Sequence, residues 1–364
     1  MTRPLPPLDV GPRSELVRER LESLGLDGLL ITNLTNVRWL TGFTGSNAAV
    51  LVTIDRLVVF TDTRYRDQAP AEMVAAGLDA DVVIGTDVVE VVASLTQPGQ
   101  TLGLEADDVS WGLQQRLASA TAPELVATSR ELLTLRSRKD PGELMRIRAA
   151  AAIADRSLAE VAPILSEGAT EREVALALDD SMRRAGAQGP AYETIVASGP
   201  RAALPHARPT DRVIGPGDLV IIDVGAAVDG YRSDMTRSFV VGDPTAEQKR
   251  MLDVVLEAQE SGKTLVCAGV SAREVDTACR SVITDAGWGE EFSHGTGHGV
   301  GLDIHEHPRL SSRTDDVLES GMVVTIEPGV YLPDRGGVRW EDLLVVTADG
   351  FEVLTESPKK PVVA

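Results

Sequence analysis

Cysteine and long apolar runs are both scarce in this sequence of 364 residues. Its two cysteines, Cys267 and Cys279, are too few for a disulfide framework, so we expect two small core residues in a reducing compartment. No apolar run approaches the ~20 residues that a transmembrane helix needs. Residues 1–7 are proline-rich and lack the apolar stretch of a signal peptide. These absences predict a cytoplasmic protein with no membrane partner.

Basic residues are also in the minority, because 35 Lys and Arg stand against 55 Asp and Glu and give a net charge of −20. A surface of this sign repels polyanions, so nucleic acid is excluded as an expected partner. The hydrophobic share of 43% is ordinary for a globular protein. At about 150 residues per domain, the length predicts two domains.

The first third of the chain alternates helical and strand patterns without a glycine-rich phosphate loop or a cluster of metal ligands. Apolar spacing predicts helices over 14–24, 87–95 and 110–118, and strands over 29–31, 48–53, 57–61, 81–84 and 101–104. This pattern indicates an α/β domain with a mixed or parallel sheet. Trp39 and Tyr65 are interpreted first as packing residues, with a substrate contact as the alternative.

The domain junction is marked by Asp140-Pro141-Gly142-Glu143, which combines an N-cap acid, a proline in the first turn and a glutamate three residues after the cap. We therefore place the boundary near residue 138, giving domains 1–138 and 139–364. Two further capping boxes start helices in the second domain, namely Thr170 with Glu173 and Ser271 with Glu274. With strands expected at 219–225, 235–241, 322–327 and 338–346, the second domain is predicted to be α+β.

Aspartates stand where an apolar strand should exclude them. Asp223 ends the run Leu219–Ile222, and Asp234 follows the turn-forming pair Asp229-Gly230. An unpaired buried carboxylate costs several kcal/mol or stays protonated. If the runs form a hairpin, the two acids lie directly opposite or diagonally, depending on which residues make the turn. Either arrangement requires a shared proton or shared cations.

The same pattern recurs with Glu327, which ends an apolar strand, and Glu341, which interrupts the next one. For any one acid, the alternative is an edge residue that faces solvent or an arginine, and Arg339 is the candidate partner of Glu341. Four such acids in two hairpins make that alternative weak, because sheets normally exclude them.

Histidines gather near these acids, with four of the five between 294 and 307 and the fifth at His206. His298 lies in a stretch with glycine at alternate positions, which lets the backbone approach a site closely. Four carboxylates and one imidazole suit Mn²⁺ or Co²⁺ at least as well as Zn²⁺. We therefore expect two divalent ions and a two-metal hydrolase.

These linked motifs resemble the pita-bread metallopeptidases, and within them the proline-specific Xaa-Pro aminopeptidases and Xaa-Pro dipeptidases. The match includes Pro205-His206-Ala207, His298-Gly299 through His305-Glu306, Ile326-Glu327-Pro328-Gly329 and Val338-Arg339-Trp340-Glu341-Asp342. The first domain resembles the creatinase-type N-terminal domain around Trp39–Ser46. The resemblance implies a pita-bread α+β catalytic domain that is preceded in the sequence by a smaller α/β domain.

Roles follow from this resemblance residue by residue. Asp223 would bind one ion, Asp234 and Glu341 would bridge the pair, and His298 with Glu327 would complete the second. Glu327 would also shuttle a proton, while His206 and His305 would steady the substrate and the developing oxyanion. Thr236 and Thr325 are expected either to support these ligands or simply to pack in their strands.

The expected substrate is a peptide with proline at its second position, and substrate length is the open question. An aminopeptidase is preferred; a dipeptidase would need a cation for the substrate carboxylate, for which Arg309 is the candidate, and Trp39 is retained as a second candidate substrate contact. A catalytically inactive binding protein of the same fold is the remaining alternative. The resemblance also suggests a homodimer. Two departures stand out: Trp340 replaces the usual aliphatic residue, and Arg201 replaces a small polar one.

Overall fold

The computed structural model describes residues 5–85, 87–121 and 123–363, so four residues of the proline-rich opening segment lie outside it. The described chain forms two compact units, Met1–Arg136 and Ser137–Ala364. Each unit has its own sheet system and its own core. Among the described residues, no helix is both long and apolar enough to span a bilayer.

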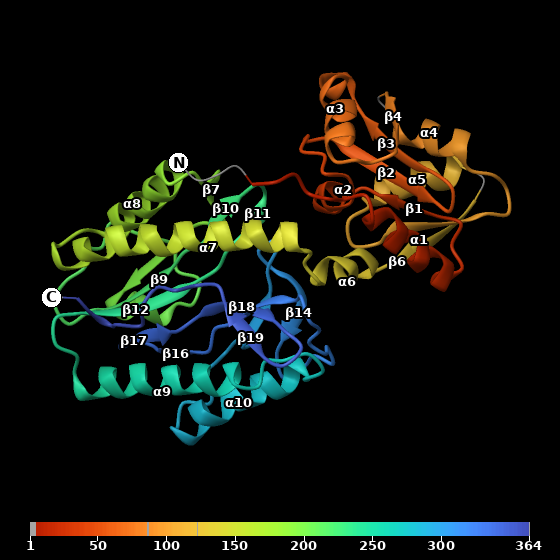
Figure 1. The fold of residues 1–364 in the computed structure, drawn as a ribbon. Coiled ribbons are helices and arrows are strands. Elements are labelled where there is room, and N and C mark those ends of the chain that lie inside the picture. The colour runs from red at the N-terminus through yellow and green to blue at the C-terminus, as the bar shows by residue number, and fades with distance from the viewer. Residues whose placement is uncertain (1–4, 86, 122, 364) are drawn as a thin grey trace. The chain divides into compact units, whose positions relative to one another are not determined.

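The first unit is built on a six-stranded mixed sheet in the order β4-β3-β2-β1-β5-β6 (Figure 1). Its strands are β1 (Gly28–Ile31), β2 (Ala48–Thr53), β3 (Leu57–Thr61), β4 (Asp81–Ile84), β5 (Thr101–Glu105) and β6 (Glu124–Thr128). Its helices are α1 (Arg13–Leu24), α2 (Leu34–Thr41), α3 (Gln68–Ala75), α4 (Val88–Leu95), α5 (Trp111–Ala120) and α6 (Glu131–Ser137). Helices α4 and α5 pack on the sheet through Val92 and Leu117, which share a core cluster with Leu30 and Leu51. Of the two forms that the sequence predicted, a mixed or a parallel sheet, the mixed one is observed.

The second unit places four main helices on two sides of a layer of strands. The helices are α7 (Pro141–Val161), α8 (Glu171–Arg184), α9 (Ala246–Lys263) and α10 (Ala272–Asp285). Capping boxes at Asp140, Thr170 and Ser271 start α7, α8 and α10 as predicted, and a further box at Thr245 starts α9. Each box satisfies backbone N–H groups that the first helical turn leaves without a partner.

The strands of this unit form several small sheets. They are β7 (Gly189–Pro190), β8 (Ile195–Ser198), β9 (Leu219–Asp223), β10 (Ala226–Val228), β11 (Tyr231–Arg232), β12 (Thr236–Val241), β13 (Gly297–Gly299), β14 (Glu306–Leu310), β15 (Val323–Ile326), β16 (Gly329–Leu332), β17 (Gly336–Arg339), β18 (Asp342–Val346), β19 (Phe351–Val353) and β20 (Val362–Val363). The larger sheets have the orders β20-β12-β9-β8 and β14-β13-β15-β18-β19.

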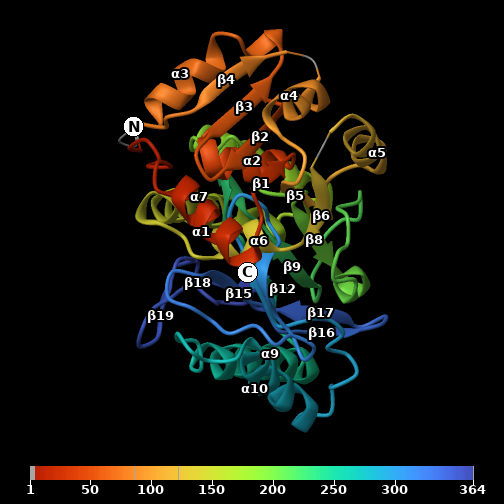
Figure 2. The ribbon, with the colours of Figure 1, turned by 90° about the vertical axis from the view of Figure 1, so that its right-hand side faces the viewer.

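Strand β9 is apolar on both faces because it feeds two cores. Leu219 and Ile221 join the cluster that includes α9 and α10, whereas Val220 and Ile222 join the cluster that includes α7 and α8. Figures 1 and 2 show the strands between α7 on one side and α9 with α10 on the other. This double burial explains the continuous apolar run of β9. Asp223, the last residue of the strand, is the point at which the chain emerges from the two cores.

Candidate metal centre

Asp223 and Asp234 come from the hairpin that runs from β9 and β10 into β11 and β12. Asp229 and Gly230 form its turn, with φ angles of +47° and +78°, as a two-residue turn of the mirror-image type requires. This turn pairs Asp223 with Thr236, so Asp234 lies diagonally from Asp223. The diagonal arrangement, one of the two that the sequence allowed, is the one observed.

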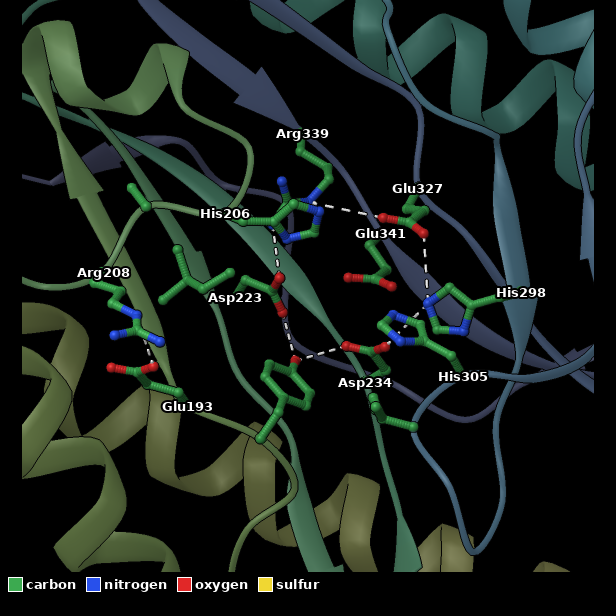
Figure 3. Close-up of a pocket in the computed structure, with 14 residues that line it drawn as sticks. Glu193, His206, Arg208, Asp223, Asp234, His298, His305, Glu327, Arg339 and Glu341 are labelled. Atoms are coloured by element: carbon green, nitrogen blue, oxygen red, sulfur yellow. Dashed lines mark hydrogen bonds and ion pairs between the residues drawn. The ribbon is translucent and has the colours of Figure 1, made fainter. Parts of the chain in front are cut away.

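Glu327 and Glu341 come from the second hairpin. Ile326 pairs with Asp342 directly beside them, and strands β16 and β17 continue in the same register beyond them. The two glutamates therefore stand opposite each other across the hairpin. In Figure 3 the carboxyl groups of all four acids point toward one common space.

His298 enters this space from β13. Gly297 has no room for a side chain, because an added Cβ would collide with the Thr325 carbonyl oxygen of the adjacent strand. This close approach brings His298 Nε2 to 3.5 Å from Asp234 Oδ2 and 3.5 Å from Glu327 Oε1. Asp234, His298 and Glu341 offer ligand atoms that all lie within 4.8 Å of one another.

Burial makes this cluster costly for a protein without cations. Asp234 and Glu341 are 5% and 1% exposed. Burial first, and then the neighbouring acids, raise the pKa of Asp234, Glu341 and Glu327 well above the usual carboxyl range. Burial lowers the pKa of His298 to about 3, so this imidazole is neutral and can donate a lone pair. Oxygen-rich donors with one neutral imidazole fit divalent ions such as Mn²⁺, Co²⁺ or Zn²⁺.

Arg339 does not balance the negative charge of the four acids. Its Nη2 donates to Asp223 Oδ2 at 2.6 Å, and its Nη1 donates to the Tyr331 hydroxyl at 2.9 Å. The sequence offered Arg339 as the partner of Glu341; its ion pairs are instead with Asp223 and, more weakly, with Glu327, whose Oε2 lies 4.0 Å from its Nε. A single guanidinium can balance only one of the four negative charges, so the others must be balanced by other means.

Tyr192, in the connection between β7 and β8, is a site residue that the sequence did not indicate. Its hydroxyl contacts Asp223 Oδ1 and lies 2.6 Å from Asp234 Oδ1. Burial and then the charges of Asp223 and Asp234 raise the pKa of this phenol well above its usual value. A neutral hydroxyl therefore joins the two aspartates of the first hairpin.

Two threonines contact the candidate ligands. Thr236 Oγ1 donates to Glu341 Oε2 at 2.7 Å and accepts from Arg339 Nε at 2.9 Å. Thr325 Oγ1 accepts the backbone N–H of His298 at 3.1 Å. Both side chains thus orient groups that face the common space.

Replacing Thr236 with valine is expected to weaken metal binding by about tenfold, because an outer hydrogen bond that orients a ligand is typically worth 10–100-fold in affinity. Titration of Mn²⁺ into the chelated protein measures the change. The serine variant keeps the hydroxyl and serves as the matched control. Equal affinities for the valine variant and the unmodified protein would show that Thr236 only fills its strand.

His206 and His305 line two cavities that flank the acids. The acidic cavity, of about 340 Å³, takes in all four acids together with Tyr192, Glu193, Ile195 and Arg208. The Arg309 cavity, of about 310 Å³, takes in Arg309, His294 and Ser311 and, of the four acids, reaches Glu327. His206, His298, His305, Glu327 and Arg339 border both cavities.

His305 is held close to the candidate ligands. Its ring makes an edge-on contact with that of His298, with centroids 4.4 Å apart. The next residue, Glu306, forms a buried ion pair with Lys139 at 2.9 Å, which anchors the segment. Burial, followed by the charge of Arg309, lowers the pKa of His305, so its ring is neutral near neutral pH and carries one N–H donor.

The remaining sequence candidates have defined surroundings. Trp39 lies inside the first unit, 2% exposed, with the Arg13 guanidinium over its ring, as expected of a packing residue. The alternative role as a substrate contact stays a prediction. Trp340 is 1% exposed, and its Nε1 donates to the Leu252 carbonyl oxygen at 3.2 Å. Arg201 binds the buried Glu171 at 3.0 Å and thus holds the loop that carries His206. Cys267 and Cys279 are both free thiols.

Comparison with known proteins identifies both parts of the chain. Residues 145–348 match the model of metallopeptidase family M24, and residues 13–138 match the creatinase/prolidase N-terminal domain. The uncharacterized peptidase YqhT of Bacillus subtilis is 38% identical over 359 residues, which are 96% of this chain and 99% of that protein.

Solved structures agree with this assignment. The Xaa-Pro dipeptidase from Bacillus anthracis superposes with a TM-score of 0.92 at 39% identity, covering 97% of this chain and 99% of that one. The X-Pro aminopeptidase from Thermotoga maritima gives a TM-score of 0.87 at 36% identity, with the same coverage. The predicted pita-bread α+β domain, preceded in the sequence by a creatinase-type α/β domain, is confirmed. The chain therefore belongs to metallopeptidase family M24 and is an enzyme of that family.

Proposed function

We propose that this enzyme is an Xaa-Pro aminopeptidase, which hydrolyses the N-terminal Xaa-Pro bond of peptides with proline at the second position. The observation that carries the proposal is the convergence of four acids and one neutral imidazole on a space that adjoins two cavities, one lined by all four acids and the other by Arg309. Relatives named for cleavage at Xaa-Pro support the substrate class. Cytoplasmic location and a homodimer stay predictions.

Two divalent ions, preferably Mn²⁺, would be held by Asp223, Asp234, His298, Glu327 and Glu341. Their mostly oxygen donor set suits Mn²⁺ and also accepts Co²⁺ or Zn²⁺. Bound there, the ions would supply Lewis acidity that lowers the pKa of water and polarises the peptide carbonyl. Asp234 and Glu341 would each serve both ions, as the family resemblance implies, and their ligand atoms lie within 4.8 Å of each other and of that of His298.

The chain's own groups would carry the proton and orient the substrate. Glu327 would take a proton from the attacking water and return it to the leaving proline nitrogen. The neutral His305 would donate its N–H to the oxygen that gains charge at the scissile carbonyl, and His206, on the same cavity walls, would hold the substrate beside it. Arg339 and Tyr192 would keep Asp223 and Asp234 in position.

An Xaa-Pro dipeptidase is the second candidate. Arg309 lines the cavity that lies away from most of the acids, where it can bind the free carboxylate of a dipeptide. The name of the Bacillus anthracis structure supports this alternative, whereas that of the Thermotoga maritima structure supports the first.

Matched assays with Ala-Pro and Ala-Pro-Ala distinguish the two. An aminopeptidase is expected to cleave the tripeptide with a kcat/KM at least about tenfold higher, a difference of roughly 1.4 kcal/mol in transition-state binding. Ala-Ala-Ala is the control for proline specificity. Cleavage of Ala-Pro alone, together with a raised KM in the Arg309→Met variant, would instead establish the dipeptidase.

A further inference from the structure

An exposed ion pair lies on the wall of the acidic cavity, apart from the candidate metal ligands (Figure 3). Arg208 Nε is 3.2 Å from Glu193 Oε2, and the two side chains are 82% and 62% exposed. Both residues line the cavity, beside His206 and Tyr192. A pair this exposed adds little to stability, so its side chains can exchange partners at little cost.

The backbones that carry this pair are fixed, although the side chains are not. Arg201 donates from Nη2 to the Arg208 carbonyl oxygen at 2.6 Å and from Nε to the buried Glu171 at 3.0 Å. Glu193 directly follows Tyr192, whose hydroxyl contacts Asp223 and Asp234. Two opposite charges are thus carried on the cavity wall by side chains that are free to move, from backbone positions that are tied to the rest of the site.

The linings of the two cavities suit different parts of a substrate. The Arg309 cavity carries the cation that suits the carboxylate side of a peptide, so the acidic cavity is left for the first residue. Two divalent ions would balance the four acids at the centre. Of the charges lining the acidic cavity, Glu193, Arg208 and Arg339 would then remain, and Arg339 is already bound to Asp223.

We propose that Glu193 and Arg208 form the charge-selecting wall of the subsite for the substrate's first side chain, which rests on the proposed function. Paired with each other, they favour an uncharged first residue. An acidic side chain must compete with Glu193 for Arg208, and a basic one must compete with Arg208 for Glu193. Removing either partner releases the other for a substrate of opposite charge.

Charge-selective kinetics with the metal-loaded enzyme test this proposal. The substrates Asp-Pro-Ala, Ala-Pro-Ala and Lys-Pro-Ala are compared for the unmodified enzyme, Glu193→Gln, Arg208→Gln and the double variant. Glu193→Gln is expected to raise kcat/KM for the Asp peptide relative to the Ala peptide by roughly threefold to tenfold. Arg208→Gln is expected to do the same for the Lys peptide, and the double variant is expected to lose both shifts. Added salt reduces each shift, because the groups are exposed.

Arg172→Gln is the matched control, since it breaks another exposed pair, with Asp211, that does not line either cavity. For this control, the ratios of kcat/KM for the Asp and Lys peptides to that for the Ala peptide are expected to equal those of the unmodified enzyme. If the unmodified enzyme cleaves Ala-Pro-Ala but the ratios of the three cavity variants stay within about twofold of its own, the subsite assignment is wrong and the proposed function stands. If none of the three peptides is cleaved by the unmodified enzyme, both are wrong.

Discussion

Replacing Asp234 with asparagine is expected to lower kcat/KM by at least about 10³-fold, or roughly 4 kcal/mol of transition-state stabilisation. Asp234 belongs to the group whose ligand atoms lie within 4.8 Å of one another, and it is 5% exposed beside His298. An amide keeps the shape of the side chain but removes the negative charge that would bridge two cations. The loss should therefore appear both in activity and in bound metal.

The stability of the same variant separates a site effect from a folding effect. Without metal, the pKa of Asp234 is raised by burial and by Asp223, which shows that its charge is unfavourable in the folded chain. Metal-free Asp234→Asn should thus unfold at a temperature at or above that of the metal-free unmodified protein. Asp349→Asn, in the exposed turn after β18, is the control and should leave activity unchanged. Full metal content and near-normal activity in Asp234→Asn would contradict the bridging role.

The metal-free protein is expected to become less stable as the pH rises from 6.5 to 8. In that state, burial and neighbouring acids raise the pKa of Asp234, Glu327 and Glu341 well above the usual range. The unfolded chain releases these protons near pH 4.5, while the folded chain keeps them to higher pH. The contribution to the free energy of unfolding is therefore complete below the unfolded pKa and is lost as the pH rises through the raised folded values.

Two buried histidines change the stability in the opposite direction at lower pH. Burial lowers the pKa of His298 to about 3 and that of His294 to about 4. Their contribution is present above the unfolded value of about 6.5 and is lost as the pH falls toward those folded values, so it opposes that of the acids at lower pH. At pH 6.5 the unfolded rings are only about half protonated and they lose the rest by pH 8, so they oppose the carboxyl groups weakly and the sign is that of the three carboxyl groups.

Thermal unfolding of chelated and Mn²⁺-loaded protein at pH 6.5 and 8 measures this effect. Bound ions require deprotonated carboxylates, so metal affinity should rise by about tenfold per pH unit for each proton released. The loaded protein should consequently lose no stability over the same interval. A chelated protein that gains stability between pH 6.5 and 8 would show that these carboxyl groups are not held protonated.

The acids could be predicted from the sequence because strands have a strict period of two and normally exclude carboxylates from apolar runs. Asp223, Asp234, Glu327 and Glu341 each break that rule, and Asp229-Gly230 supplies a recognisable turn. The sequence leaves the register open, because it is compatible with either of two turn placements. Positive φ angles at Asp229 and Gly230 select the diagonal pairing.

Tyr192 and the partner of Arg339 could not be predicted, because both depend on contacts between segments far apart in sequence. Tyr192 is 31 residues from Asp223, and Arg339 is 116 residues from it. Short or marginal elements were missed for a different reason. Strand β6 lies at the edge of its sheet and is only partly buried, so its apolar alternation is weak. Helix α2 has eight residues and depends on the Asn33 cap.

Stepwise addition of Mn²⁺ to chelated protein, with bound metal and Ala-Pro-Ala hydrolysis followed in the same samples, tests the central claim most directly. We expect no hydrolysis at the start, tight binding of two ions per chain, and activity that rises with their occupancy. The Asp234→Asn variant should fail to bind the pair under the same conditions. Full hydrolytic activity in protein that carries essentially no metal would contradict the two-metal account.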